Sequence, residues 1–251
     1  MNTGTRPLAQ GRARRLRALA VLLLLAPGWA AAALSVVGTR FIYPAGAKEL
    51  TVQVGNAGNG PILVQAWLDR GDPDADPARL SVPFVLAPPM FRLDAERKSV
   101  LRLRHTGEPL PGDRESVFWL NFLEVPALPE DSRNLLRLSY RSRMKLLYRP
   151  AGLPGSADEA VTSVAWRFGA ASVSGEAVLE ADNPTPYHVS FAQMTVERGG
   201  ASVELGGRTL APLGVTRIAL PGLKGAGEAV VRYEVAKDSG ELVGASVSVR
   251  P

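Results

Sequence analysis

The chain has 251 residues, of which 46% are hydrophobic and 21% are charged, a balance too apolar for a disordered polypeptide and sufficient for one large or two small domains. It contains no cysteine, which excludes disulfides, zinc–thiolate sites, iron–sulfur clusters and thiol nucleophiles. Its two histidines leave few options for a metal centre or a general base.

The first 33 residues have the pattern of a secretory signal peptide. Five arginines and no acidic residue precede or flank an apolar run from Ala18 to Ala26, and the small residues Ala30–Ala33 follow it. We place the cleavage near Ala32 or Ala33. A membrane anchor is the alternative, but the apolar run is shorter than the ~20 residues that a spanning helix needs, so we expect no stable membrane insertion.

The formal net charge of +5 belongs to this leader, because residues 34–251 hold 24 basic and 24 acidic side chains. The charge is therefore no evidence for nucleic-acid binding, which needs a basic patch on the domain itself, and we expect no nucleic-acid partner. Export of a chain without cysteine fits a bacterial periplasm better than it fits a disulfide-rich extracellular module.

Strand signals dominate the chain after residue 33. The segment LSVV at 34–37 is expected to pair along a sheet edge. Apolar residues then alternate with polar ones, and clusters of Gly, Pro, Asn and Asp separate the runs, which predicts an antiparallel β-sandwich. The alternating runs lie at 50–54, 62–68, 101–104 and 117–122. The one helical feature that we expect is a single turn around 77–80.

The longest regular run is LLRLSYRSRMKLLYR at 135–149, which we expect to form one long strand. Its apolar side chains project to one side and its cations to the other, because the period is two and not 3.6. A strand of this length would span about 50 Å. Two interpretations stay open: a central strand of a large sheet, or an edge strand whose backbone is kept open for a partner.

A proline- and glycine-rich segment, RPAGLPG at 149–155, ends this run and reads as an interdomain connection. Short strand-like runs resume after it, at 164–168, 178–180, 189–196, 216–220, 230–235 and 242–249. We therefore predict an all-β chain with a leader at 1–33, a first domain at 34–150 and a second, smaller sandwich at 151–251.

The sequence carries no recognisable catalytic pattern. His105 and His188 lie far apart and are expected in loops or at the surface, and no HExxH, G-x-S-x-G, P-loop or G-x-G-x-x-G motif occurs. Asp72, Asp74 and Asp76 mimic the start of a calcium loop, but prolines occupy its sixth and twelfth positions. We predict no catalytic residue, no metal and no cofactor, while a hydrolase whose carboxylates come from distant positions stays open.

Five motifs occur in one order along nearly the whole chain. They are GTRFIYP at 38–44, APPMFRLDAERKSVLRL at 87–103, LPGDRESVFWLNFLEVPA at 110–127, RMKLLYRP at 143–150 and NPTPYHV at 183–189. In this order they resemble the periplasmic chaperones of the chaperone–usher pathway, which assemble surface pili. Phe122 stands where that family usually has an aliphatic residue, which we expect to alter packing and not function. The short, cysteine-free link at 125–134 resembles the short-loop branch of the family.

The resemblance implies two immunoglobulin-like domains set in an L or boomerang shape. Pilus subunits of that pathway are incomplete sandwiches, and the chaperone lends a long strand of its first domain to complete them. By motif, Arg40 and Lys145 match the two cations that hold the subunit's C-terminal carboxylate. The side chains that would enter the subunit's groove are Leu136, Leu138, Tyr140 and Met144. The residues that match an interdomain ion-pair network are Glu115, Arg149 and, more loosely, Asp238.

The partners that the resemblance implies are pilus or fimbrial subunits and an outer-membrane usher, and the free chaperone could cap its open strand in a dimer. Each site residue also has an ordinary explanation. The cations could lie beside strands at the surface, the ion-pair residues could be solvated, and the apolar row could face the domain's own core. The alternative functions are a secreted two-domain adhesin or pilus structural component, and a periplasmic carbohydrate-active enzyme.

Overall fold

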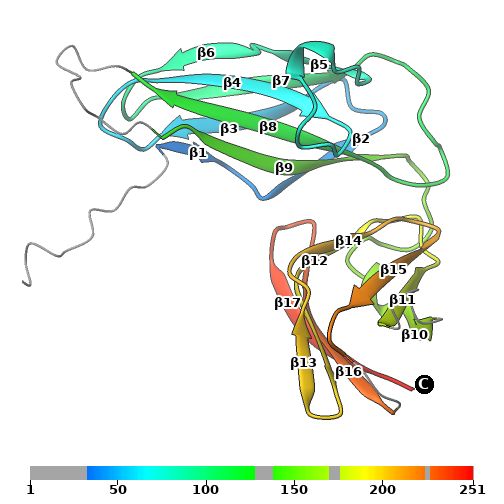
Figure 1. Cartoon of the computed structure of the whole chain (residues 1–251). Helices are drawn as coiled ribbons and strands as arrows, with labels where there is room; N and C mark the ends of the chain where they lie inside the picture. The colour runs from blue at the N-terminus through cyan, green and yellow to red at the C-terminus, as the bar shows by residue number, and fades with distance from the viewer. Residues whose placement is uncertain (1–32, 128–137, 170–175, 224–226, 251) are drawn as a thin grey trace, which may run out of the picture. The chain divides into compact units, whose positions relative to one another are not determined.

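The computed structural model describes residues 33–127, 138–169, 176–223 and 227–250, and strands make up most of these residues (Figure 1). Two short 3-10 turns interrupt them, η1 (Pro77–Arg79) and η2 (Ala160–Ser163). The side chain of Asp76 accepts a hydrogen bond from the Ala78 amide and caps η1, so the expected turn around 77–80 is confirmed.

The first nine strands form two sheets that enclose one core. One sheet has four strands in the order β1-β3-β7-β5, and the other has five in the order β2-β9-β8-β4-β6. β1 lies at an edge, as expected for the LSVV segment. The bounds are β1 (Leu34–Val36), β2 (Arg40–Pro44), β3 (Leu50–Asn56), β4 (Ile62–Asp69), β5 (Phe84–Ala87), β6 (Met90–Leu93), β7 (Lys98–His105), β8 (Ser116–Pro126) and β9 (Tyr140–Arg149).

Alternating burial along the strands builds the core of this first sandwich. In β8 the side chains of Phe118, Leu120 and Phe122 face inward, and each is at most 1% exposed. Phe122 lies in this core, and its effect on packing and function relative to an aliphatic residue stays a prediction. Tyr43 of β2 is also fully buried, and its hydroxyl donates to the Ala47 carbonyl oxygen at 2.9 Å, which satisfies its polar end.

The remaining strands form a second sandwich with its own core, so the predicted all-β chain with two sandwiches is confirmed. Its sheets have the orders β10-β11-β15 and β13-β12-β16-β17, and β14 pairs with β12. The sequence pattern missed the short strands β13 and β14. The bounds are β10 (Ala165–Gly169), β11 (Ala177–Asn183), β12 (Val189–Arg198), β13 (Ala201–Glu204), β14 (Arg208–Leu210), β15 (Gly214–Leu220), β16 (Ala229–Ala236) and β17 (Leu242–Val249).

β9 changes its number of neighbours along its length. β8 pairs antiparallel with it over residues 140–148, whereas β2 pairs parallel with it only over 145–149. The interpretation that the whole run at 135–149 has an open edge is therefore wrong for 145–148, where strands pair on both flanks. Residues 135–137 lie outside the described residues. Within the described part, Tyr140–Met144 has one strand neighbour, and this segment is called the free flank below.

Leu146 and Leu138 lie on the same side of the run and should differ sharply in their effect on stability. Leu146 is 0% exposed and Leu138 is 48% exposed. We expect Leu146→Ala to lower the free energy of unfolding by about 2–5 kcal/mol, because it empties packed volume. Leu138→Ala should change it by less than about 0.5 kcal/mol. Urea titrations measure both, and equal losses would contradict the assignment.

Candidate functional site

Two cations stand side by side where the pairing of β2 with β9 begins. Arg40 is the first residue of β2, and it lies directly opposite Lys145 of β9 in the parallel register. Opposite residues of neighbouring strands project from the same face of the sheet, and the strands lie about 4.8 Å apart. The fold therefore brings together two positive charges that are 105 positions apart in the sequence.

Neither cation has a carboxylate partner among the residues that the structure describes. The Lys145 ammonium donates to the Ser190 hydroxyl at 2.9 Å and to the Thr209 hydroxyl, both from the second sandwich. Arg40 donates through Nη1 to the Ala236 carbonyl oxygen at 2.6 Å, while its buried Nε has no hydrogen-bond partner. Neutral oxygens thus hold both side chains in place without neutralising their charge.

Burial makes this pair of charges unfavourable in the absence of an anion. It lowers the pKa of Lys145 to about 8, with the neighbouring positive charge of Arg40 as a second cause. Burial is also the main reason that the pKa of Arg40 is lowered. An anion placed between them would favour both charged forms. A carboxylate suits the pair, because arginine can bind it through two hydrogen bonds and lysine adds a point charge.

Arg149, at the end of β9, connects three segments through its guanidinium group. Its Nε donates to Oε1 of Glu115 at 2.7 Å, and its Nη1 and Nη2 donate to the carboxylate of Asp238 at 2.6 and 3.0 Å. Burial alone would lower the pKa of Arg149, but the hydrogen bonds to Asp238 and Glu115 outweigh it and raise the pKa. The structure thus brings together the three residues that the resemblance grouped as an ion-pair network.

His188 belongs to the same network, which the sequence did not reveal. The Glu115 carboxylate is fully buried and accepts from the His188 backbone amide at 2.8 Å, while the His188 ring Nδ1 lies 3.3 Å from it. His188 lies in the loop before β12, as expected, but its side chain is 6% exposed, so the alternative place at the surface is wrong. Its position at the end of NPTPYHV was the available signal, because that motif brings a backbone amide to Glu115.

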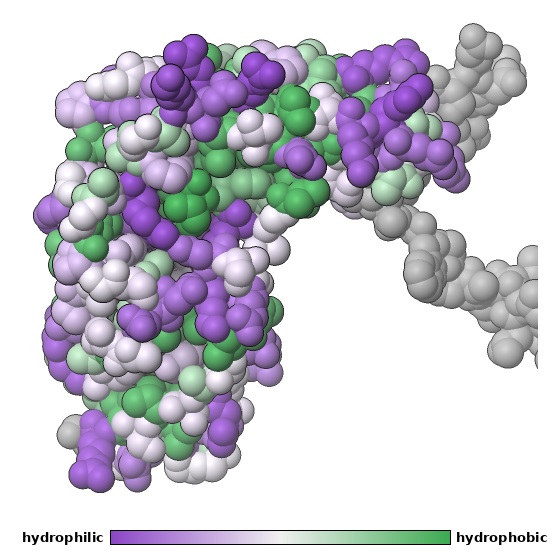
Figure 2. Space-filling view, turned by 180° about the vertical axis from the view of Figure 1, so that it is seen from behind, coloured by the Kyte–Doolittle hydropathy of each residue, from purple (hydrophilic) through white to green (hydrophobic). Residues whose placement is uncertain are grey.

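The apolar row predicted at 136–144 divides between its own core and solvent. Met144 is partly buried and packs against the core of the first sandwich, and its role as a side chain offered to a partner stays a prediction. Tyr140 is partly buried, and Leu138 is exposed. Leu136 lies outside the described residues. Leu138 is one of several large apolar side chains that are exposed. Hydrophobic and hydrophilic residues mix on the face of the molecule that Figure 2 shows.

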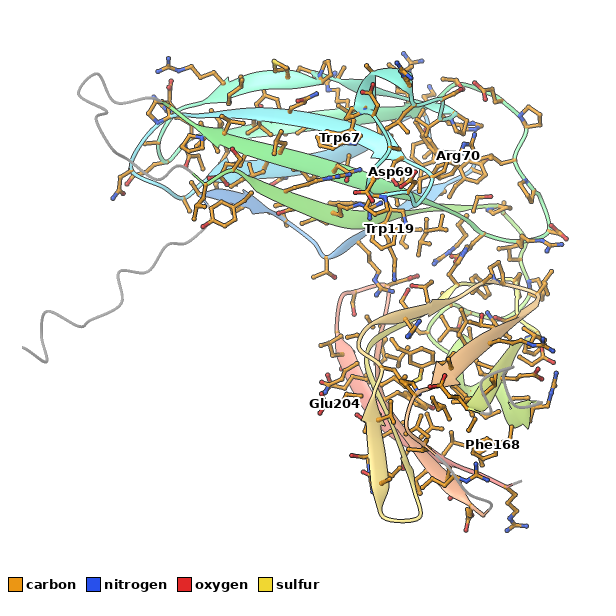
Figure 3. All side chains as sticks on the ribbon, in the orientation of Figure 1. Trp67, Asp69, Arg70, Trp119, Phe168 and Glu204 are labelled. Atoms are coloured by element: carbon orange, nitrogen blue, oxygen red, sulfur yellow. The ribbon has the colours of Figure 1, made fainter. Side chains whose placement is uncertain are left out.

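A second polar cluster, also missed by the sequence reasoning, fixes the outer face of the free flank. Arg143 donates to both oxygens of the buried Asp69 at 2.8 and 3.0 Å, and its guanidinium carbon lies 4.7 Å from the ring centroid of Trp119. Arg141 lies in the same way 4.9 Å from the ring of Trp67. Figure 3 shows the two tryptophans and Asp69 close together on β4 and β8. These contacts attach the free flank to its neighbours through side chains.

Within the described residues, no group of three or more His, Asp or Glu side chains is arranged to hold a metal ion. None of the helical segments described there has the length and apolar character needed to cross a bilayer.

Comparison with known families accounts for nearly all of the described chain. The model for the pili and flagellar-assembly chaperone PapD N-terminal domain matches residues 33–154. The model for the pili assembly chaperone PapD C-terminal domain matches residues 159–246. These matches support two domains, while the boundary at residue 150 stays a prediction.

Curated relatives and solved structures agree with the family matches. The chain is 40% identical over 214 residues to the probable fimbrial chaperone YadV of Escherichia coli K12, covering 83% of this chain and 86% of that protein. It is 43% identical over 227 residues to the chaperone protein FimB/FhaD of Bordetella pertussis, covering 88% and 89%.

Among solved structures, the crystal structure of the YadV chaperone matches with a TM-score of 0.72 at 38% identity, over 86% of this chain and 99% of that one. A Salmonella enterica SafA pilin in complex with the SafB chaperone provides another match, with a TM-score of 0.68 at 30% identity, over 86% and 94%.

Because the pKa of Lys145 is lowered in the folded protein, the free energy of unfolding depends on pH in a direction that can be predicted. Unfolding returns the pKa of Lys145 from about 8 to 10.5, so between these pH values the unfolded chain binds more protons than the folded one. The free energy of unfolding therefore rises as pH increases through this range. We expect Lys145→Met to remove that part of the rise and the exposed control Lys48→Met to keep it, as measured by urea titrations. The same slope in both variants would contradict the assignment.

Proposed function

Because the chain belongs to the family of pilus-assembly chaperones, we propose that it binds pilus subunits by lending them the free flank of β9, with no catalytic step. The observation that carries the proposal is the end of β2–β9 pairing at Lys145, beside Arg40. It leaves Tyr140–Met144 open on the side where these two cations lie, neither of which forms an ion pair with a described residue. The adhesin and enzyme alternatives have no comparable feature in their favour.

The open backbone supplies affinity. An extended segment of a partner that pairs along the free flank would form main-chain hydrogen bonds there, and apolar side chains of β9 would fill alternate positions in the partner's groove. Leu138 and Tyr140 support this role, because neither is fully buried in its own sandwich. Leu136 would extend the same row. Met144 contributes less, since part of its surface already packs inside.

The two cations would fix the register and the direction of a partner strand bound along the free flank. A strand bound along the free flank would occupy the side that β2 covers further on, so its end would meet Arg40. If that end is the C-terminal carboxylate, the strand runs in the same direction as β2, which is parallel to β9. Each charge-assisted hydrogen bond to the carboxylate contributes about 1.5–3 kcal/mol. The position of the carboxylate then fixes which partner residues face Leu138 and Tyr140.

The network around Arg149 supports the same function by holding the second sandwich against the end of β9. Asp238 and His188 belong to the second sandwich, and Ser190 and Thr209 from the same sandwich hold Lys145. We propose that this keeps the lysine ammonium directed toward the incoming carboxylate. We further propose that the leader at 1–33 exports the chain to the periplasm, where an outer-membrane usher receives its complexes, and that the free protein can cap its open flank in a dimer.

Removal of either cation should weaken subunit capture without unfolding the protein. We expect Arg40→Ala and Lys145→Ala each to weaken the complex about 10- to 100-fold, because each loses one charge-assisted contact with the carboxylate. Lys48→Ala, at an exposed lysine of the same sandwich, serves as the control. Co-expression with a pilus subunit and recovery of the soluble periplasmic complex give the measurement. Recovery at the wild-type level from both variants would refute the carboxylate site.

A charge at Leu138 should impair capture through the groove and not through folding. We expect Leu138→Glu to reduce the recovered complex at least about tenfold, because a carboxylate would have to enter an apolar groove. Val85→Glu, at a side chain 58% exposed on β5, is the matched control and should have no effect. Melting temperatures of both variants should stay near the parent's. A large fall for Leu138→Glu would instead place this side chain in the protein's own core.

A further inference from the structure

Glu124 is an acidic residue in a row of core-facing positions. It follows Phe118, Leu120 and Phe122 at every second residue of β8, and it is 5% exposed. Such a position normally takes an apolar side chain, because a buried carboxylate loses its hydration. An acid at this place therefore needs partners that compensate its charge.

The partners of Glu124 come from the beginning of the described chain. Its Oε1 accepts from the backbone nitrogen of Ala33 at 3.0 Å, and its Oε2 accepts from that of Leu34 at 2.8 Å. Among the described residues, no lysine, arginine or histidine forms an ion pair with it. Two neutral amide groups satisfy the lone pairs in part but bring no positive charge, and a buried carboxylate without a cation is unfavourable.

Ala33 is itself held closely on its other sides. Its carbonyl oxygen accepts from the Ala57 amide at 2.7 Å. A Cβ atom on Gly58 would lie 2.6 Å from the Cβ of Ala33, so the glycine provides the space in which this alanine sits. The unit that contains both sandwiches also begins at Ala33. The nitrogen of this residue therefore has a fixed position beside the carboxylate.

We propose that Glu124 is the binding site for the α-ammonium group that forms when the chain is cleaved between Ala32 and Ala33. The inference rests on the export step of the proposed function and not on subunit binding. Hydrolysis consumes one water, breaks the amide C–N bond, leaves a carboxylate on Ala32 and leaves an amine on Ala33. That amine takes up a proton at neutral pH and becomes the cation that Glu124 lacks.

The ion pair would also affect the binding strand. Glu124 lies opposite Tyr140 in the register of β8 and β9, and Leu34 begins the pairing of β1 with β3. Removal of the leader would thus strengthen the contact between Leu34, at the start of β1, and Glu124 of β8, which joins the two sheets of the first sandwich. This contact lies next to Tyr140, the first residue of the free flank. The protein would reach its full stability only after export.

The test uses periplasmic protein produced from the full chain. Intact mass should place the N-terminus at Ala33, and isotopic formaldehyde should then label the α-amine slowly, because an ammonium beside a carboxylate keeps its proton. We expect Glu124→Gln to label roughly tenfold faster at neutral pH and the exposed control Glu49→Gln to label as the parent does. A mature terminus at another residue, or equal labelling of all three proteins, would overturn the proposal.

A second comparison covers the case in which Glu124→Gln fails to fold. Insertion of Gly-Ser after Ala32 moves the new ammonium away while leaving the Ala33 amide in place, so it should lower the melting temperature and speed α-amine labelling to the unpaired rate. Labelling as slow as in the parent would overturn the proposal. Neither α-amine labelling nor the melting temperature involves a pilus subunit. The test of the Glu124 site and the test of subunit capture can therefore fail independently of each other.

Discussion

The length of β2 is the constraint on which the binding site depends. β2 pairs with β9 over 145–149 and stops, so that one strand is an interior member of its sheet at one end and an edge at the other. The paired half is buried around Leu146 and Leu147, which gives the strand a fixed position. The other half, Tyr140–Met144, keeps backbone N–H and C=O groups available for pairing with a further strand. A single strand can thereby hold its own domain together and offer a template to another chain.

The charges lie at the boundary between these two halves. Arg40 and Lys145 form the first pair in the register of β2 with β9, and oxygens of the second sandwich orient both side chains. The buried carboxylate of Glu115, in contrast, is paired with Arg149 and accepts from the His188 backbone amide. Each arginine of β9 has a carboxylate within ion-pair distance, whereas Lys145 has none among the described residues, and Lys145 lies where a bound strand would end.

The sequence was sufficient for the strands whose residues alternate clearly, including β3, β4, β7 and β8, and the ordered motifs identified Arg40 and Lys145 as a pair. It could not show where β2 would stop against β9, because that register depends on residues 105 positions apart. Met144 and Leu138 look equivalent in a period-two pattern, yet one packs inside and the other does not. The Asp69–Arg143 cluster and the burial of His188 depend on tertiary contacts for the same reason.

The point at which β2 begins also acts as a ruler. The free flank of Tyr140–Met144 corresponds to about 17 Å of extended chain, at 3.3 Å per residue. Each residue by which β2 reached further back along β9 would shorten the available template by one step and would turn the next side chain to the opposite face. The start of β2 therefore sets both the length of the partner segment that can pair along the free flank and the face to which each side chain of that segment points. The partner itself would contact β2 only at its first residue.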